Sequence, residues 1–290
     1  MTEETSAGST PTLAAIFTPD LPPERLGTVA SAADAAGLAQ LWIWEDCFKE
    51  SGIATATAIL ATTSQVTVGI GLLPVPLRNV ALTAMEIATL ARLFPGRLTV
   101  GVGHGVLDWM GQAGARVESP MTLLHEYTAA LYSLLQGQTV TTHGRYVHLD
   151  RVALDWPPVV VPPLLVGGIR PRTVSLAGEL ADGVIIPGGN SPADVRAAVG
   201  HFRGGRAARP SGTVSGLISG TVGGPISGTV GGREDVVVFV SVPTGSTAAG
   251  VAATVTEYAA AGATHVAVST DADLERFVGF LAGEVSPLVS

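Results

Sequence analysis

The sequence Phe94-Pro-Gly-Arg-Leu-Thr-Val-Gly-Val-Gly-His-Gly105 decides the fold class. The Pro-Gly pair at its start ends the preceding helical pattern. A short apolar strand follows, and glycines occur at the carboxyl end of that strand. Glycines at the carboxyl end of a strand let backbone N–H groups approach a ligand closely. The same design, an apolar run followed by glycines, returns at residues 164–168 and 182–189. We therefore expect three strands to contribute to one rim of a binding site.

Short apolar runs alternate with longer helical patterns along nearly the whole chain. The predicted strands are residues 13–17, 40–44, 66–71, 98–102, 164–167, 183–186, 236–242 and 265–269. The predicted helices are residues 24–36, 53–62, 80–94, 121–136, 172–181, 192–203, 247–261 and 273–282. Strands that are each followed by a helix predict an α/β fold, a (β/α)8 TIM barrel. A doubly wound open sheet is the alternative, because counting elements does not show closure.

Two segments interrupt this alternation. After the fourth helix, residues 139–149 predict a small β-hairpin, which we expect to pass over the barrel mouth. Before the seventh strand, residues 211–234 contain three tandem copies of an eight-residue Gly-rich unit and predict a flexible insert. A phosphate-binding loop is the less favoured alternative there, because no P-loop helix follows. We expect residues 1–10 to be a disordered tail and residues 11–290 to form a single domain.

The composition is typical of a compact enzyme domain, since 47% of the 290 residues are hydrophobic and 14% are charged. A net charge of −8 without any basic cluster argues against nucleic acid as a partner. No run approaches the roughly 20 apolar residues of a membrane span. The single cysteine, Cys47, fits a reducing cytoplasm. The spacing of histidines and carboxylates predicts no metal site.

The carboxyl ends of the predicted strands supply the candidate catalytic residues, because barrels bind ligands there. Glu45 and Asp46 follow the second strand, and adjacent carboxylates point in different directions. One of them is expected to face a ligand as a hydrogen-bond acceptor or acid/base. The alternative is that one caps the next helix or pairs with Arg78. His104 could move a proton near neutral pH, or it could simply pack over the rim.

A phosphate site is predicted at Gly167-Gly-Ile-Arg170, immediately before a helix that opens at Pro171. Free N–H groups at a helix N-terminus attract anions, and one arginine adds a positive charge. Trp44 and Trp109 could form walls beside a flat ring system, although core packing is the usual fate of tryptophan.

Together these motifs resemble the luciferase-like monooxygenase family, the flavin- and deazaflavin-dependent (β/α)8 oxidoreductases. The resemblance covers the chain from about Leu13 to Leu288. Its most specific parts are residues 88–105, 124–127, 134–137, 144–146, 162–168 and 177–183.

The resemblance implies a cofactor ring at the barrel mouth, backed by Gly71, Leu72 and Leu73, where members often have a non-proline cis peptide. It implies that Asp46 faces the ring. Many deazaflavin members have a histidine next to that position, and Cys47 here puts a histidine acid/base in doubt. The expected catalytic residues are His104 and Asp46. The expected cofactor contacts are Gly71, Leu72, Leu73, Gly103, His104, Gly105, Val166, Gly167, Gly168, Ile169, Arg170 and Pro187.

The resemblance further implies a cytoplasmic oxidoreductase that transfers a hydride between bound coenzyme F420, a deazaflavin, and a small organic substrate. F420 is favoured over FMN because residues 94–114 resemble the deazaflavin group. One alternative is an FMN-dependent monooxygenase supplied by a separate flavin reductase. Another is a non-catalytic flavin-binding or scaffold member. Related barrels often pair through helices, so the expected assembly is a homodimer.

Overall fold

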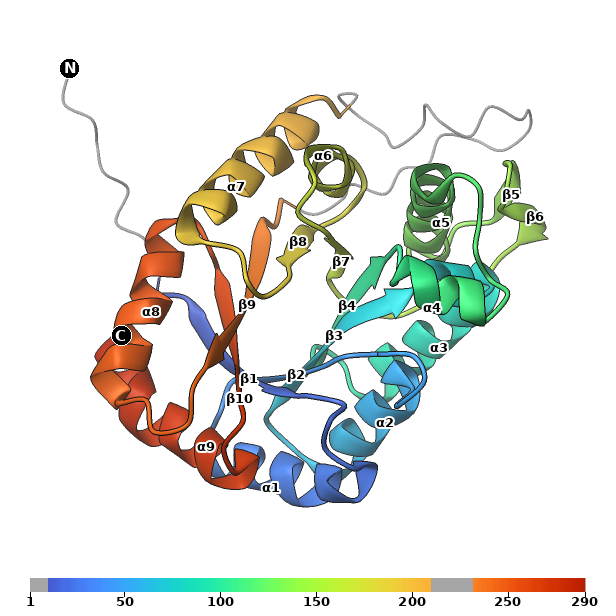
Figure 1. The fold of residues 1–290 in the computed structure, drawn as a ribbon. Helices are drawn as coiled ribbons and strands as arrows, with labels where there is room; N and C mark the ends of the chain where they lie inside the picture. Colours follow the sequence, from blue (N-terminus) through green and yellow to red (C-terminus); the bar gives the residue numbers. More distant parts are fainter. Residues whose placement is uncertain (1–9, 210–231, 290) are drawn as a thin grey trace.

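The computed structural model describes residues 10–209 and 232–289, in which eight parallel strands close into a barrel (Figure 1). The strands are β1 Thr12–Phe17, β2 Gln40–Ile43, β3 Thr67–Pro74, β4 Leu98–Gly103, β7 Leu164–Gly167, β8 Gly183–Ile186, β9 Asp235–Val242 and β10 His265–Thr270. Around the barrel they follow the order β1-β10-β9-β8-β7-β4-β3-β2. The predicted TIM barrel is confirmed, and the open sheet is excluded because β1 pairs with both β10 and β2.

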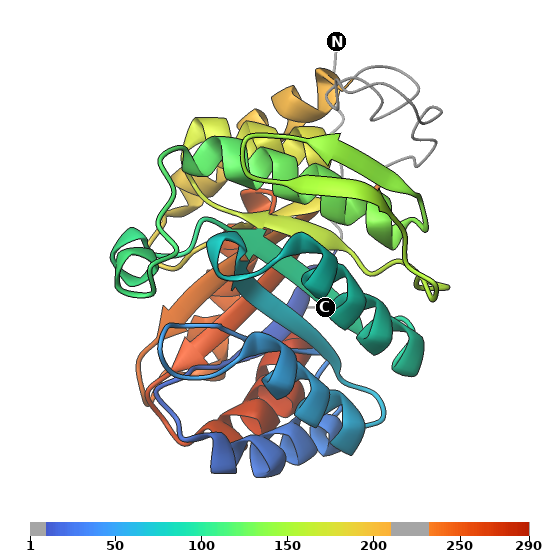
Figure 2. The same cartoon turned by 90° about the vertical axis from the view of Figure 1, so that its right-hand side faces the viewer.

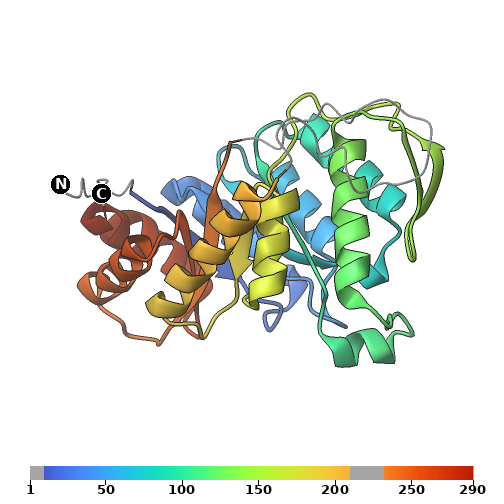
Figure 3. The same cartoon turned by 90° about the horizontal axis from the view of Figure 1, so that it is seen from above.

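Helices surround the barrel on the outside (Figures 1 and 3). They are α1 Leu26–Ala36, α2 Gly52–Thr62, α3 Val80–Leu93, α4 Leu107–Gln112, α5 Pro120–Leu135, α6 Pro171–Leu180, α7 Pro192–Ala207, α8 Ala248–Ala260, α9 Leu274–Phe280 and α10 Ser286–Val289. Short helical turns occur at η1 Pro23–Arg25 and η2 Val75–Leu77, and a π-helical segment at η3 Leu281–Val285. The helix α4 was not predicted, because it has only six residues and glycines lie on both sides of it. It projects from the carboxyl end of the barrel (Figure 2).

The barrel strands separate two apolar cores. The inner core consists of Ala14, Ile16, Trp42, Leu165, Ile185, Val237, Phe239 and Ala267. The indole of Trp42 crosses the barrel so closely that a Cβ on Gly69 would lie 2.4 Å from it. Its Nε1 donates a hydrogen bond of 2.7 Å to Gln40 Oε1. The alternate strand residues pack beneath the helices, which explains the continuously apolar strands in the sequence.

The predicted hairpin forms from β5 Val140–His143 and β6 His148–Val152. It lies on the outer side of α5, away from the barrel axis (Figure 1). The expectation that it passes over the mouth is therefore wrong. The reason is local: the carboxylate of Glu126 on α5 accepts N–H bonds from Arg145, Tyr146 and Val147 in the hairpin turn.

The predicted tail and insert lie almost entirely outside the described residues. Of the tail only Thr10 is described, and of the insert only residues 232–234. Glu234 in this last part forms an ion pair of 2.7 Å with Arg203 of α7. In the ranges that the structure describes, no helix is long and apolar enough to cross a membrane.

Candidate active site

Leu72 forms the floor of the barrel mouth. The peptide bond between Gly71 and Leu72 is cis, as the resemblance implies, and the register of β3 against β4 shifts at this point. The Leu72 side chain lies across the next two strands. A Cβ on Gly103 of β4 would be 2.5 Å from Leu72 Cδ2, and a Cβ on Gly167 of β7 would be 2.3 Å away. These two glycines, expected to let a ligand approach, also make room for Leu72.

An aromatic wall rises beside this floor. Trp44, directly after β2, packs against Phe239 of β9 with ring centroids 5.7 Å apart. Phe239 also meets Trp42 edge-on at 5.5 Å, which joins the wall to the inner core. Trp44 is half-buried, and its buried Nε1 has no hydrogen-bond partner among the described residues. A donor is thus held at the mouth without an acceptor.

His104 lies where the β4 loop meets the first turn of α6. Its Nε2 is 3.4 Å from Thr173 Oγ1, while its buried Nδ1 has no described partner in hydrogen-bond geometry. Burial lowers the pKa of His104, the charge of Arg170 lowers it further, and the backbone of Pro120 acts in the opposite direction. The ring is therefore neutral at pH 7 and can accept a proton.

Glu45 has a structural role. Its carboxylate is 2.6 Å from Arg78 Nη2 and also accepts the backbone N–H of Gly52, at the start of α2, at 2.6 Å. Arg78 is held on its other side by Glu86 at 2.9 Å. The alternative interpretation, in which a carboxylate caps the helix and pairs with Arg78, is confirmed for this residue.

Asp46, the neighbour of Glu45, is half-buried and makes no such pair. Burial raises the pKa of the Asp46 carboxyl, Lys49 opposes this effect and the negative charge of Asp20 reinforces it. The structure thus separates two adjacent carboxylates, one fixed by an arginine and one left with a raised pKa at the mouth.

The predicted phosphate turn leads into an uncapped helix. Gly168 is not a free donor, because its N–H bonds to Ile185 O at 2.9 Å. The helix α6 begins at Pro171 as predicted, and its N-cap, Arg170, makes no side-chain cap. The helices α3, α7, α8 and α9 are capped by Asn79, Ser191, Thr247 and Asp273. The amides of the first turn of α6 therefore remain available to an anion.

Charge is divided between opposite sides of the mouth. Arg170 and Arg172 follow β7. The strand diametrically opposite is β1, four places away in the eight-strand order. On that side the loops after β10, β1 and β2 carry the acidic residues Asp271, Asp273, Asp20, Asp46 and Glu50, together with Lys49, which pairs with Asp20. This arrangement favours an anionic group at β7 and disfavours one near β1.

The other predicted cofactor contacts differ in what they can offer. The side chains of Leu73 and Val166 belong to the outer core and are 1% and 0% exposed, so only their backbones could touch a ligand. Ile169 is half-buried at the rim. Pro187 is exposed, and its carbonyl accepts a bond of 2.8 Å from Asn190 Nδ2. Gly105 has φ 67° and starts the loop that leads to α4.

Four residues at the mouth were not singled out from the sequence: Phe239, Ser241, Ser269 and Thr173. The hydroxyls of Ser241 and Ser269 lie 3.0 Å apart at the ends of β9 and β10. Strand alternation places Val237, Phe239 and Ser241 on one face, so periodicity could have identified two of the four. Thr173 carries no comparable signal, since only the tertiary contact with His104 reveals it.

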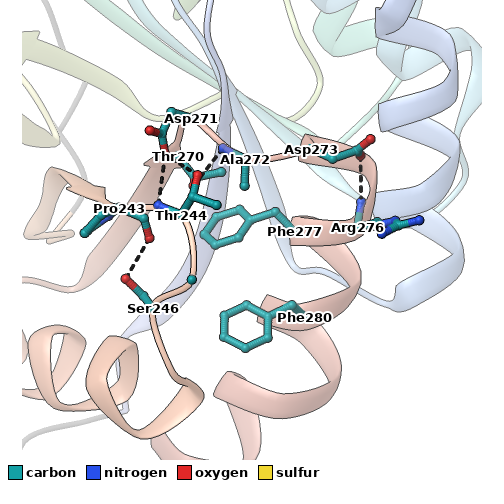
Figure 4. Close-up of a pocket in the computed structure, with 11 residues that line it drawn as sticks. Pro243, Thr244, Ser246, Thr270, Asp271, Ala272, Asp273, Arg276, Phe277 and Phe280 are labelled. Atoms are coloured by element: carbon teal, nitrogen blue, oxygen red, sulfur yellow. Dashed lines mark hydrogen bonds between the residues drawn. The ribbon is translucent and has the colours of Figure 1, made fainter.

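Cavities lie at both ends of the barrel. One of about 430 Å³ lies between the loops that follow β9 and β10, at the carboxyl end of the barrel (Figure 4). The other, of about 850 Å³, lies between α7 and α8 beside Thr264, which precedes β10, and so at the amino end. Within residues 10–209 and 232–289, no group of three potential metal-ligating side chains gathers.

Comparison with known proteins gives a family and a set of relatives. The model of the luciferase-like monooxygenase family matches residues 3–277. The 5,10-methylenetetrahydromethanopterin reductase of Methanolobus tindarius is 29% identical over 189 residues, 65% of this chain and 57% of the relative. An F420-dependent glucose-6-phosphate dehydrogenase of Nakamurella multipartita is 30% identical over 192 residues, 59% of this chain and 54% of the relative. The chain thus spans little more than half the length of these relatives.

A solved structure supports the fold. The F420-dependent secondary alcohol dehydrogenase in complex with an F420–acetone adduct superimposes with a TM-score of 0.81, at 16% identity, over 97% of this chain and 100% of that one. At this identity the likeness concerns the arrangement of the barrel and not its chemistry.

Proposed function

This chain belongs to the luciferase-like monooxygenase family, and we propose that it is an oxidoreductase that transfers a hydride between bound coenzyme F420 and a small organic substrate. The observation that carries the proposal is a pair of buried nitrogen atoms at the mouth, Trp44 Nε1 and His104 Nδ1, without partners in the described chain. Buried polar atoms are almost always hydrogen-bonded. A flat guest that carries polar atoms would supply the missing partners.

The residues present fit the cofactor. Arg170 and the uncapped first turn of α6 suit its phosphate. Leu72 and Trp44 offer a floor and a wall to a flat ring. F420, when bound, supplies hydride transfer, and the protein binds it, orients it and excludes water. The names of the reductase and dehydrogenase relatives, which act with F420 or on a reduced pterin, favour this cofactor over FMN.

Two groups are available for the proton that accompanies the hydride. His104 is neutral at pH 7 and can accept a proton on a ring nitrogen. Asp46 has a raised pKa and can hold or release a proton closer to neutrality than an ordinary carboxyl. His104 lies beside the β7 turn and Asp46 follows β2, so the two groups approach the mouth from different sides.

Retention of cofactor during ultrafiltration tests the proposal. The protein is expected to retain F420 and to release FMN at micromolar concentration. Tight retention of FMN without F420 would instead support the two-component monooxygenase, which oxygen uptake with reduced FMN would then confirm. Failure to bind either cofactor would support the non-catalytic alternative.

We further propose a cytoplasmic homodimer that pairs through α3. Leu82, Met85 and Leu93 lie on one side of this helix with 48%, 57% and 64% of their surface exposed. Arg92 of the same helix contacts an exposed loop: its guanidinium lies 5.3 Å from the ring of Trp156, which is 72% exposed. Exposed apolar side chains that lie together on one helix face are a feature of protein interfaces. The free Cys47 agrees with a reducing compartment.

A further inference from the structure

We propose that the cavity between the loops after β9 and β10 binds the apolar part of an uncharged or cationic substrate and excludes anionic ones. This inference rests on the proposed function, because it names the substrate class of the same barrel mouth. The cavity has a volume of about 430 Å³, within the usual range for small-molecule sites.

Aromatic side chains give the cavity its apolar surface. The rings of Phe277 and Phe280 are stacked with centroids 5.9 Å apart and 29° between their planes. They face the loop that begins at Pro243, and Ala272 closes the cavity above them (Figure 4). This surface can accept a small hydrocarbon or a ring, since apolar burial needs no specific partner.

Two aspartates line the polar part of the cavity. Asp271 accepts hydrogen bonds from Thr244, at 2.9 Å from its N–H and 2.6 Å from its Oγ1. These bonds lower the pKa of Asp271, so the carboxylate is ionised at neutral pH. Asp273 accepts the N–H of Arg276 at 3.2 Å. Arg276 is the one cation among the residues that line this cavity, against two carboxylates.

The neighbouring charges beside the cavity are paired. In barrel order β10 is next to β1, and after β1 Asp20 pairs with Lys49 while Arg25 pairs with Glu275. The arginines that follow β7, Arg170 and Arg172, lie on the opposite side of the mouth. These arginines can therefore bind a phosphate of the cofactor, but they lie too far from the cavity to bind an anionic substrate there. By this reasoning the chain differs in substrate charge from the relative named for glucose 6-phosphate.

Three probes of one shape and different charge test the inference: benzylamine, benzyl alcohol and benzoate. Their binding to the protein without cofactor is measured by ligand-observed NMR. We expect benzylamine and benzyl alcohol to bind about fivefold more tightly than benzoate, because two carboxylates and only one guanidinium line the cavity. Equal or tighter binding of benzoate would overturn the proposal.

Variants locate the binding and separate it from the cofactor site. Ala272→Phe fills the cavity and should abolish the benzyl alcohol signal, while Ala197→Phe on the exposed side of α7 should not. Asp271→Asn should reduce the preference for benzylamine and benzyl alcohol over benzoate. This second variant tests the inference independently of how well Ala272→Phe folds. Unchanged binding in Ala272→Phe, or an unchanged preference in Asp271→Asn, would contradict the assignment. F420 retention is measured in parallel, so its failure counts against the proposed function and not against the cavity.

Discussion

Leu72 Cδ2 lies 2.3 Å from the position that a Cβ on Gly167 would occupy. A Cβ on Gly103 of the adjacent strand β4 would lie 2.5 Å from the same atom. Gly103 of β4 and Gly167 of β7 thus leave the space that the Leu72 side chain occupies at the mouth.

Gly167→Ala is expected to destabilise the protein by about 1–3 kcal/mol, the usual cost of overpacking, and to weaken F420 retention. Urea unfolding and fluorescence titration measure the two effects. Gly188→Ala is the control, because a Cβ there would have 3.6 Å to the nearest atom, Phe239 O. In a Leu72→Ala background the loss caused by Gly167→Ala should shrink. Additive losses would show that the contact with Leu72 is not the cause.

The ion pair between Glu45 and Arg78 should matter for stability, because the two side chains are only 8% and 13% exposed. Glu45→Ala leaves a nearly buried guanidinium with Glu86 alone, and we expect a loss of about 3 kcal/mol in the free energy of unfolding. Lys49→Ala, which breaks a pair with Asp20 that is 44% and 79% exposed, should cost less than about 1 kcal/mol. Similar losses in urea unfolding of both variants would argue against the structural role of Glu45.

His104 predicts a pH dependence of stability with a definite sign. Burial lowers the folded pKa of His104 below its ordinary value of about 6.5, so below about pH 6.5 the unfolded chain binds more protons. Stability should fall as the pH drops from 6.5 to the folded pKa and then become level with respect to this group. His104→Gln should flatten part of this slope in urea unfolding between pH 5 and 8. His265, whose pKa burial also lowers, contributes to the slope in the same direction.

The proposed dimer can be tested on α3. Met85→Glu combined with Leu93→Glu introduces two charges into the exposed stripe, and the protein should become a monomer by light scattering. Ala197→Glu, on the exposed side of α7, should leave the mass unchanged. A wild-type protein that is already monomeric at micromolar concentration would exclude this interface.

The positions of the strands could be predicted closely because their residues are buried on both sides. The predicted limits of β7 and β8 match the structure; β7 ends at Gly167, and β8 begins at Gly183. The helix α4 was not predicted, since a six-residue segment flanked by glycines has a low helix propensity. The limits of the last helix were also wrong: it leaves α-helical geometry after Phe280 and continues as a π-helical segment.

The roles of site residues were harder to predict than their location. Glu45 and Asp46 are adjacent and chemically alike, and only the approach of Arg78 from the next loop distinguishes them. The location of the hairpin likewise depended on Glu126, a residue of α5 that lies 19 positions before Arg145. Contacts between residues so far apart in the sequence leave no signal in a local sequence pattern.

The sequence by itself determined the alternation of strands and helices, the glycine-ended rim and the family, because these follow from short-range periodicity and from motifs in fixed order. Only the tertiary structure decided that Leu72 fills the space beside Gly103 and Gly167, that His104 meets Thr173, and that the charges divide between the β7 and β1 sides. Barrel closure is the physical reason, since it brings together strand ends that are far apart in the chain.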